Sequence, residues 1–173
     1  ISEGLVDGLR IDHIDGLADP RGYCHKLRRR VDALSPERHL PIFVEKILGE
    51  GETLRRDWQV DGTTGYEFMN QLSLLQHDPD GEYVLGDLWQ RRTERPAAFI
   101  EEAQLARQQI LNGSLASDCE SVAQALLQVA RDDLMTRDLT LGSIRRVLQA
   151  LIVHFPVYRT YIGALGRSAQ DEV

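Results

Sequence analysis

Two carboxylates, each near the end of a short apolar segment, carry the chemistry that this sequence offers. Asp12 lies in the run GLRIDHIDGL, and Glu45 lies in the run PIFVEKIL. A carboxylate nucleophile and a carboxylic acid about 5 to 5.5 Å apart can transfer a glycosyl group with retention of configuration. Arg10, two residues before Asp12, would keep that carboxylate ionised through its charge and hydrogen bonds. The residues alone equally allow a plainer interpretation, in which both acids are solvated and Arg10 forms an ordinary salt bridge.

Both apolar segments are expected to be β-strands, over residues 5–12 and 42–47. Alternation along the first strand sends Arg10 and Asp12 to the same face. In the second strand Glu45 shares its face with apolar neighbours, a setting that would keep the acid protonated, as a proton donor requires. A strand, a helix and a strand at this spacing form a βαβ unit, whose strands are parallel. In (β/α) barrels the chemistry lies at the C-terminal ends of such strands.

Helical patterns fill most of the remaining chain. Asp19 followed by Pro20 predicts a helix start, and Thr64 with Glu67 predicts a capping box. Later stripes predict a short amphipathic segment near residue 83, three further helices before Pro156, and an extended or strand-like stretch after it. In the first helix we expect the buried stripe to be Tyr23, Leu27, Val31 and Leu34. In one later helix we expect it to be Leu115, Cys119, Val122, Leu126 and Val129.

The predicted fold class is therefore α/β in a larger parent protein, as a piece of a (β/α)8 barrel followed by an α-helical insertion domain. We expect residues 1–80 to belong to the barrel, residues 81–156 to form a helical bundle, and residues 157–173 to be a return strand or extended connection with a frayed tail. A barrel needs about 250 residues, so a chain of 173 cannot hold all of it. By itself this chain should be predominantly α with a few short parallel strands.

Composition excludes several classes of function. The formal net charge of −7 favours neither nucleic acid nor an anionic membrane. No apolar run is long enough to span a bilayer, and two distant cysteines form neither a metal nor a redox motif. His13, Asp15 and Asp19 match no metal-binding spacing and are better interpreted as a polar loop. We therefore expect no metal or other cofactor, and a cytoplasmic location.

The ordered set of runs resembles a known group of enzymes. Arg and Asp two residues apart, followed by a Glu on the next strand, is similar to the nucleophile and acid/base strands of the α-amylase superfamily of glycoside hydrolases. A more detailed set of runs is similar to the maltooligosyl trehalose synthase family within that superfamily. These runs are GLRIDHIDGLADP (8–20), VEKIL (44–48), Asp57-Trp58, GTTGY (62–66) and FPVYRTY (155–161).

This resemblance implies roles for the two acids. Asp12 would be the nucleophile and Glu45 the acid/base in an intramolecular transglucosylation of maltooligosaccharides. The reaction converts the reducing-end α-1,4 linkage to an α,α-1,1 linkage and gives maltooligosyl trehalose. The superfamily also has an earlier Asp and Asn-His motif and a third catalytic carboxylate, and this sequence contains neither. We therefore expect both to lie in the rest of the parent barrel, and the isolated chain to be inactive.

Seven residues are candidates for contact with the sugar. Arg10 and His13 would lie beside the reaction centre, and the loop with Thr63, Thr64 and Tyr66 would lie near the substrate, although helix capping also explains that loop. Lys46 could reach a sugar hydroxyl or be a surface lysine. Trp58 could stack on a glucose ring or anchor its own loop.

Two other functions stay open at this point. One is a different α-amylase-type glycoside hydrolase or glucanotransferase, against which the runs at 62–66 and 155–161 argue. The other is not enzymatic: a helical interaction domain with a strand-like N-terminus.

Overall fold

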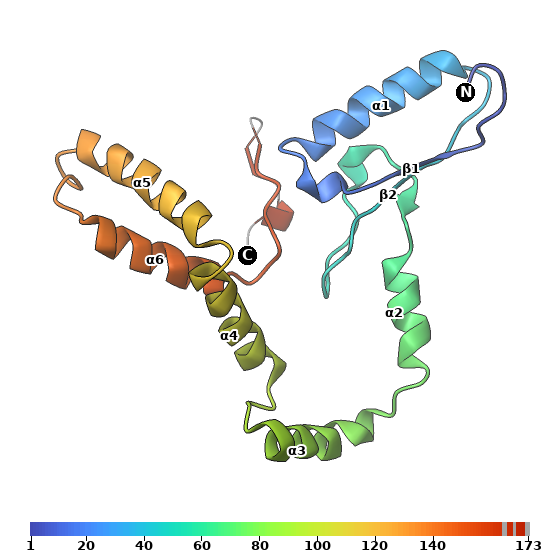
Figure 1. The fold of residues 1–173 in the computed structure, drawn as a ribbon. Helices are drawn as coiled ribbons and strands as arrows, with labels where there is room; N and C mark the ends of the chain where they lie inside the picture. Colours follow the sequence, from blue (N-terminus) through green and yellow to red (C-terminus); the bar gives the residue numbers. More distant parts are fainter. Residues whose placement is uncertain (164–165, 168, 172–173) are drawn as a thin grey trace. The chain divides into compact units, whose positions relative to one another are not determined.

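The computed structural model describes residues 1–163, 166–167 and 169–171 (Figure 1). It divides the chain into two compact units, one made of Ile1–His77 with Val157–Val173 and one made of Asp78–Pro156. The described residues are mostly helical, with three short parallel strands. The prediction of a predominantly α chain with a few parallel strands is therefore confirmed, while the parent barrel stays a prediction.

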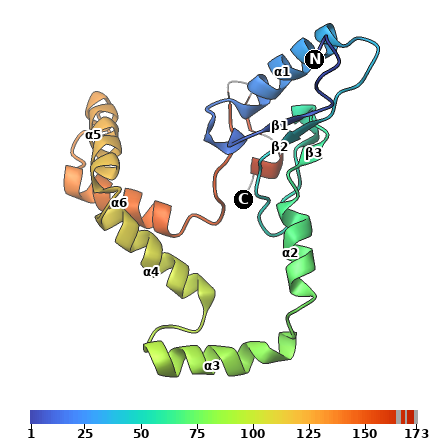
Figure 2. The ribbon, with the colours of Figure 1, turned by 45° about the vertical axis from the view of Figure 1, so that its right-hand side comes forward.

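The sheet of the first unit has the strand order β1-β2-β3 (Figure 2). Strand β1 is Leu9–Ile11, β2 is Ile42–Val44 and β3 is Gly62–Thr63. All pairings are parallel, with Arg10 opposite Phe43. Both predicted strands are thus present and parallel, although each is shorter than the apolar run that predicted it. We did not predict β3, because two residues give no alternation to detect.

Helix α1, Pro20–Leu34, joins β1 to β2 as predicted. Asp19 caps it by accepting a hydrogen bond from the Gly22 N–H at 2.8 Å. The predicted buried stripe is wrong at Tyr23, whose side chain is exposed, because Cys24 faces the core instead. The buried residues of α1 are Pro20, Cys24, Arg28 and Val31.

Two small apolar clusters form the core of this unit. One joins the loop after β1, helix α1, strand β2 and the loop before β3, and the other lies beneath the first half of β2. Their buried members are Ile14, Cys24, Val44 and Trp58 in the first, and Val31, Leu40 and Ile42 in the second.

Helix α2, Tyr66–Leu74, begins after Gly65, which has the left-handed φ of 89° that favours glycine. The predicted capping box is wrong. It is Thr63, not Thr64, whose hydroxyl contacts Glu67, and Thr63 also accepts from the Gly65 N–H. No residue of α2 is buried.

The second unit contains α3 (Glu82–Thr93), α4 (Phe99–Asn112), α5 (Ala116–Asp132) and α6 (Leu141–Val153). Helices α4, α5 and α6 pack against one another. The helices are present where their stripes predicted them, but the stripe of α5 is wrong by one position. Its buried residues are Cys119, Ala123, Leu127 and Ala130, while Val122, Leu126 and Val129 are exposed.

The return segment 157–162 contains no strand: residues 157–158 form a bend, and residues 159–162 have no regular secondary structure. A short 3-10 turn, η4, spans Ala169–Asp171. The predicted fraying is wrong at Asp171, whose carboxylate is buried against Arg55. Residues 164–165, 168 and 172–173 lie outside the described residues. Among the helices that are described, none has the length and apolar character required to cross a bilayer.

Candidate active site

Asp12 and Glu45 come together at the C-terminal ends of β1 and β2. Arg10 donates from Nη1 to Oδ1 of Asp12 at 2.9 Å, and its Nη2 lies 3.6 Å from Oε1 of Glu45. The carboxyl groups of Asp12 and Glu45 lie close enough for each to influence the other. One guanidinium therefore bridges two acids that come from neighbouring parallel strands.

Interaction with the neighbouring carboxyl group of Glu45 lowers the pKa of Asp12 below its usual value of 3.8, and the hydrogen bond and charge of Arg10 lower it further. Asp12 is therefore ionised at neutral pH. Its side chain is 74% exposed, so nothing in the described chain covers the oxygen that would attack a substrate.

Glu45 is held more firmly than Asp12. Its backbone N–H donates to the Ile11 carbonyl at 2.8 Å, which fixes it to the end of β1. One carboxyl oxygen accepts from the His13 backbone N–H at 2.9 Å, and the other lies 3.4 Å from the Tyr66 hydroxyl. Tyr66 is thus a sequence-predicted site residue that the structure brings to the acid/base candidate.

His13 contacts Glu45 through its backbone, because it occupies the left-handed region with φ 49°. Its imidazole lies over Gly16, where an added Cβ would come within 2.3 Å of Cδ2. Gly16 therefore allows the ring to lie across the loop that follows β1. Within the described chain no group of three His, Cys, Asp or Glu side chains could hold a metal ion.

The two threonines of the 62–66 loop differ in their surroundings. Thr63 is turned toward the start of α2 by its contacts with Glu67 and Gly65. Thr64 joins the sheet through its backbone N–H, which donates to Val44 at 3.1 Å. Its hydroxyl is buried without a hydrogen-bond partner among the described residues.

The structure contradicts the sugar-contact hypothesis for Trp58 and Lys46. Trp58 is 1% exposed and packs edge-on against Tyr161, with ring centroids 5.2 Å apart, so it anchors its loop. Lys46 is 3% exposed, which also excludes the surface-lysine alternative. Its ammonium donates to Glu52 at 2.8 Å and to the Ile47 carbonyl at 2.7 Å.

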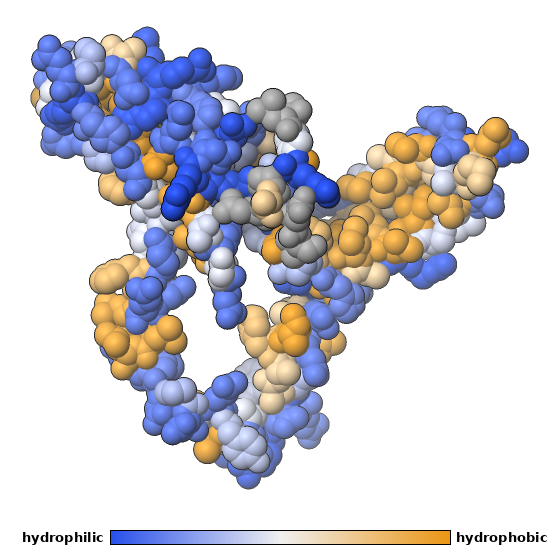
Figure 3. Space-filling view, turned by 180° about the vertical axis from the view of Figure 1, so that it is seen from behind, coloured by the Kyte–Doolittle hydropathy of each residue, from blue (hydrophilic) through white to orange (hydrophobic). Residues whose placement is uncertain are grey.

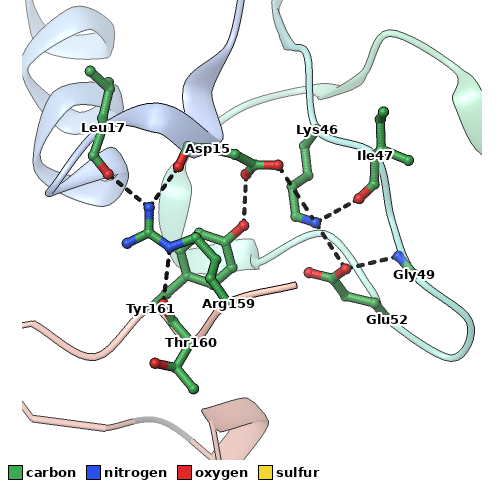
Figure 4. Close-up of polar contacts among 9 residues, drawn as sticks. All are labelled: Asp15, Leu17, Lys46, Ile47, Gly49, Glu52, Arg159, Thr160 and Tyr161. Carbon is green, nitrogen blue, oxygen red and sulfur yellow. Dashed lines mark hydrogen bonds and ion pairs between the residues drawn. The ribbon is translucent and has the colours of Figure 1, made fainter. Parts of the chain in front are cut away.

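Sequence reasoning missed a partly buried polar cluster next to this site (Figure 4). Asp15, which we interpreted as part of a polar loop, accepts from the Tyr161 hydroxyl at 2.6 Å. Arg159 donates to the backbone carbonyl of Asp15 at 2.6 Å. The run FPVYRTY at 155–161 was the available signal, because it stood out by resemblance although no role followed from it.

Comparisons with known proteins find relatives for about half of this chain. No protein-family model matches the chain. Two curated proteins of Mycobacterium tuberculosis, from strains CDC 1551 and H37Rv, are each 47% identical to it over 84 residues, which is 49% of this chain. Both are provisionally named maltooligosyl trehalose synthase.

Solved structures extend the match over nearly the whole chain. The DSM5389 glycosyltrehalose synthase matches 98% of it with a TM-score of 0.70 and 32% identity. A single-residue variant of the Arthrobacter ramosus maltooligosyltrehalose synthase matches 93% of it with a TM-score of 0.68 and 34% identity.

The chain therefore resembles a segment of the enzymes that are named as synthases of trehalose derivatives. More narrowly, the predicted similarity to maltooligosyl trehalose synthases is confirmed for that segment. The matched part covers only 10% of the length of the curated relatives and 19 to 20% of the solved chains. The activity of a full-length protein with this sequence is therefore proposed below.

Proposed function

We propose that this chain supplies the nucleophile and the acid/base of an enzyme that isomerises maltooligosaccharides to maltooligosyl trehaloses. The observation that carries the proposal is the joint placement of Asp12 and Glu45 at adjacent strand ends, bridged by Arg10. The names of the relatives supply the substrate class. A parent (β/α)8 barrel and a helical insertion belong to the same proposal.

The first half of the reaction breaks the linkage at the reducing end. The carboxylate of Asp12 attacks the anomeric carbon of the penultimate glucose, while Glu45 gives its proton to the departing oxygen. A covalent glycosyl ester on Asp12 and a free glucose result. Arg10 keeps Asp12 ionised before the attack, in agreement with its lowered pKa.

The second half forms the new linkage. The released glucose turns over, and the oxygen of its anomeric hydroxyl attacks the anomeric carbon of the enzyme-bound glycosyl group. The bond between that carbon and Asp12 breaks while Glu45 accepts the proton of the hydroxyl. Asp12 leaves as a carboxylate, so both groups return to their starting states and no water is consumed. Water that reaches the ester would instead cause hydrolysis, and the site must therefore exclude it.

Asp12→Ala tests the proposal in the full-length protein that carries this sequence. We expect turnover of maltopentaose to fall by about 10³-fold or more, since the covalent step loses its nucleophile. The melting temperature should stay nearly unchanged because the Asp12 side chain is 74% exposed. Asp32→Ala, another acidic side chain that is largely exposed, is the control.

The products separate the alternatives. A non-reducing pentasaccharide supports the isomerase, whereas glucose with maltotetraose as the main products would indicate an ordinary α-amylase-type hydrolase. Full activity of Asp12→Ala would contradict the nucleophile assignment. The isolated chain of 173 residues should form neither product, because the third carboxylate of the superfamily is not in it.

A further inference from the structure

The loop that follows the nucleophile candidate is held by a segment from the far end of the chain. The Tyr161 hydroxyl donates to Oδ1 of Asp15 at 2.6 Å across 146 positions of sequence. Arg159 Nη1 donates to the backbone carbonyls of Asp15 at 2.6 Å and of Leu17 at 2.9 Å (Figure 4). Both the side chain and the backbone of this loop are therefore fixed from outside it.

Tyr161 is itself rigidly placed. Its backbone N–H donates to the buried carboxylate of Asp171 at 2.8 Å. The guanidinium groups of Arg159 and Arg55 lie 4.8 and 5.0 Å from the centre of its ring, and Trp58 packs edge-on against the same ring. The hydroxyl can therefore point only toward Asp15.

Burial, and then the hydrogen bond and charge of Asp15, raise the pKa of Tyr161 well above its usual value of 10. The phenol consequently stays protonated and donates to Asp15 throughout the physiological pH range. A charge-assisted bond of this kind is stronger than one between neutral groups.

The same loop reaches Glu45. Lys46, the next residue in the chain after Glu45, has its ammonium 3.9 Å from Oδ2 of Asp15. His13, two residues before Asp15, donates its backbone N–H to Glu45. Asp15 thus belongs to a loop that contacts Glu45 through the His13 N–H, and it also lies near Lys46, the neighbour of Glu45 in the chain.

We propose that Tyr161 is a positioning residue that, through Asp15, holds the 13–17 loop in the geometry required for transfer in preference to hydrolysis. The inference rests on the proposed function. A loosened loop would misplace His13 and Glu45 and would lengthen the time during which water can reach the glycosyl ester. A larger fraction of the glycosyl ester would then react with water, and a smaller fraction would be transferred to the released glucose.

Tyr161→Phe in the full-length protein removes the hydroxyl and keeps the aromatic packing. With maltopentaose we expect kcat to fall about ten-fold with little change in KM, and the ratio of non-reducing product to glucose to fall about five-fold. The product ratio does not depend on how much of the enzyme is folded, so a merely structural role leaves it unchanged. Tyr83→Phe, the same chemical change at an exposed helical residue, should leave both quantities unchanged.

Each outcome decides one question. A wild-type ratio and kcat in Tyr161→Phe would overturn the positioning role, even if the melting temperature fell. Formation of no non-reducing product by the wild type would instead overturn the proposed function, and the comparison of kcat with KM would still test positioning in the remaining reaction. Arg159→Met, which removes both carbonyl contacts of the loop, replaces Tyr161→Phe if that variant does not fold, with the same expected changes.

Discussion

Asp61 ties the start of β2 to the loop before β3. One carboxylate oxygen accepts from the Ile42 N–H at 2.7 Å, and the other lies 2.6 Å from Nε2 of His39. Arg28 approaches the same carboxylate at 3.5 Å. Burial by itself raises the pKa of Asp61, but the hydrogen bonds from Ile42 and His39 and the nearby positive charges outweigh it and lower the pKa below 3.8.

This shift predicts how the stability of the first unit depends on pH. Because the folded-state pKa of Asp61 is depressed, its stabilisation is complete above about pH 5 and is lost as the pH falls through the folded-state value. Asp61→Asn keeps the shape of the side chain but does not ionise. The difference in free energy of unfolding between wild type and variant should therefore shrink between pH 6 and pH 3.

Urea unfolding followed by tryptophan fluorescence measures this difference. A Trp89→Phe background leaves Trp58, which is in the first unit, as the reporter. A difference that stays constant over this pH range would show that the charge of Asp61 does not contribute.

Among single residues, the sequence predicted that Asp12 and Glu45 lie at neighbouring strand ends but not the contacts that support them. Asp12, Glu45 and Arg10 follow from alternation and from parallel strands, which place successive strand ends side by side. The sequence left sugar stacking and loop anchoring open for Trp58 and did not predict the burial of Lys46, because nothing in it shows that the chain after β2 folds back onto a core. Contacts made across more than a hundred positions, as with Tyr161, leave no periodic signal in either partner.

Helix α1 is joined to the sheet by one buried cation. Arg28 donates from Nη1 to the Leu40 carbonyl at 2.9 Å and from Nε to Asp32 at 2.9 Å. With Asp61 on its other side, it links three segments of the first unit. The sequence does not single out Arg28, because a run of three arginines is typical of a solvated helix face.

Arg28→Met should therefore destabilise the first unit by about 2 to 3 kcal/mol, since it leaves a buried carbonyl and a carboxylate without their charged donor. Arg30→Met, at an exposed position of the same helix, is the matched control and should cost less than about 0.5 kcal/mol. Urea unfolding in the Trp89→Phe background measures both. Equal effects of the two substitutions would contradict a linking role for Arg28.

For the helices and strands, the sequence predicted which segments form each kind of element better than it predicted which residues of a helix are buried. The stripe of α5 shifted by one position because small residues, Ala123 and Ala130, allow close packing where larger ones were expected inside. A prediction from hydropathy places Val and Leu inside in preference to Ala, whereas the contacts between packed helices depend on the shape and size of the side chains. Strands β1 and β2 are shorter than their apolar runs because pairing ends where the loops turn away.

The whole molecule exposes much apolar side-chain surface (Figure 3). Helices α2 and α3 contain no buried residue. Patches of this extent are unusual in proteins that fold alone and mark surfaces that other protein normally covers. The most exposed large apolar side chains include Leu75, Tyr83, Phe99 and Met135.

We therefore expect the isolated chain to bind the dye anilinonaphthalene sulfonate strongly while its far-ultraviolet circular dichroism stays helical. The full-length protein should bind several-fold less dye per molecule, because the rest of that protein would cover these helices. Dye fluorescence at equal molar concentrations measures the difference. Equally weak binding by both would show that the apolar side chains are covered within the chain itself.

The first unit is assembled from two stretches that are separated by the whole second unit. During translation at 5 to 20 residues per second, the partner of Asp15 is synthesised about 7 to 30 s after Asp15 itself. Asp78–Pro156 is contiguous and is complete before Tyr161 leaves the ribosome. The nascent 13–17 loop therefore lacks this anchor while the helical unit is made, and this interval is when a chaperone would be of most use.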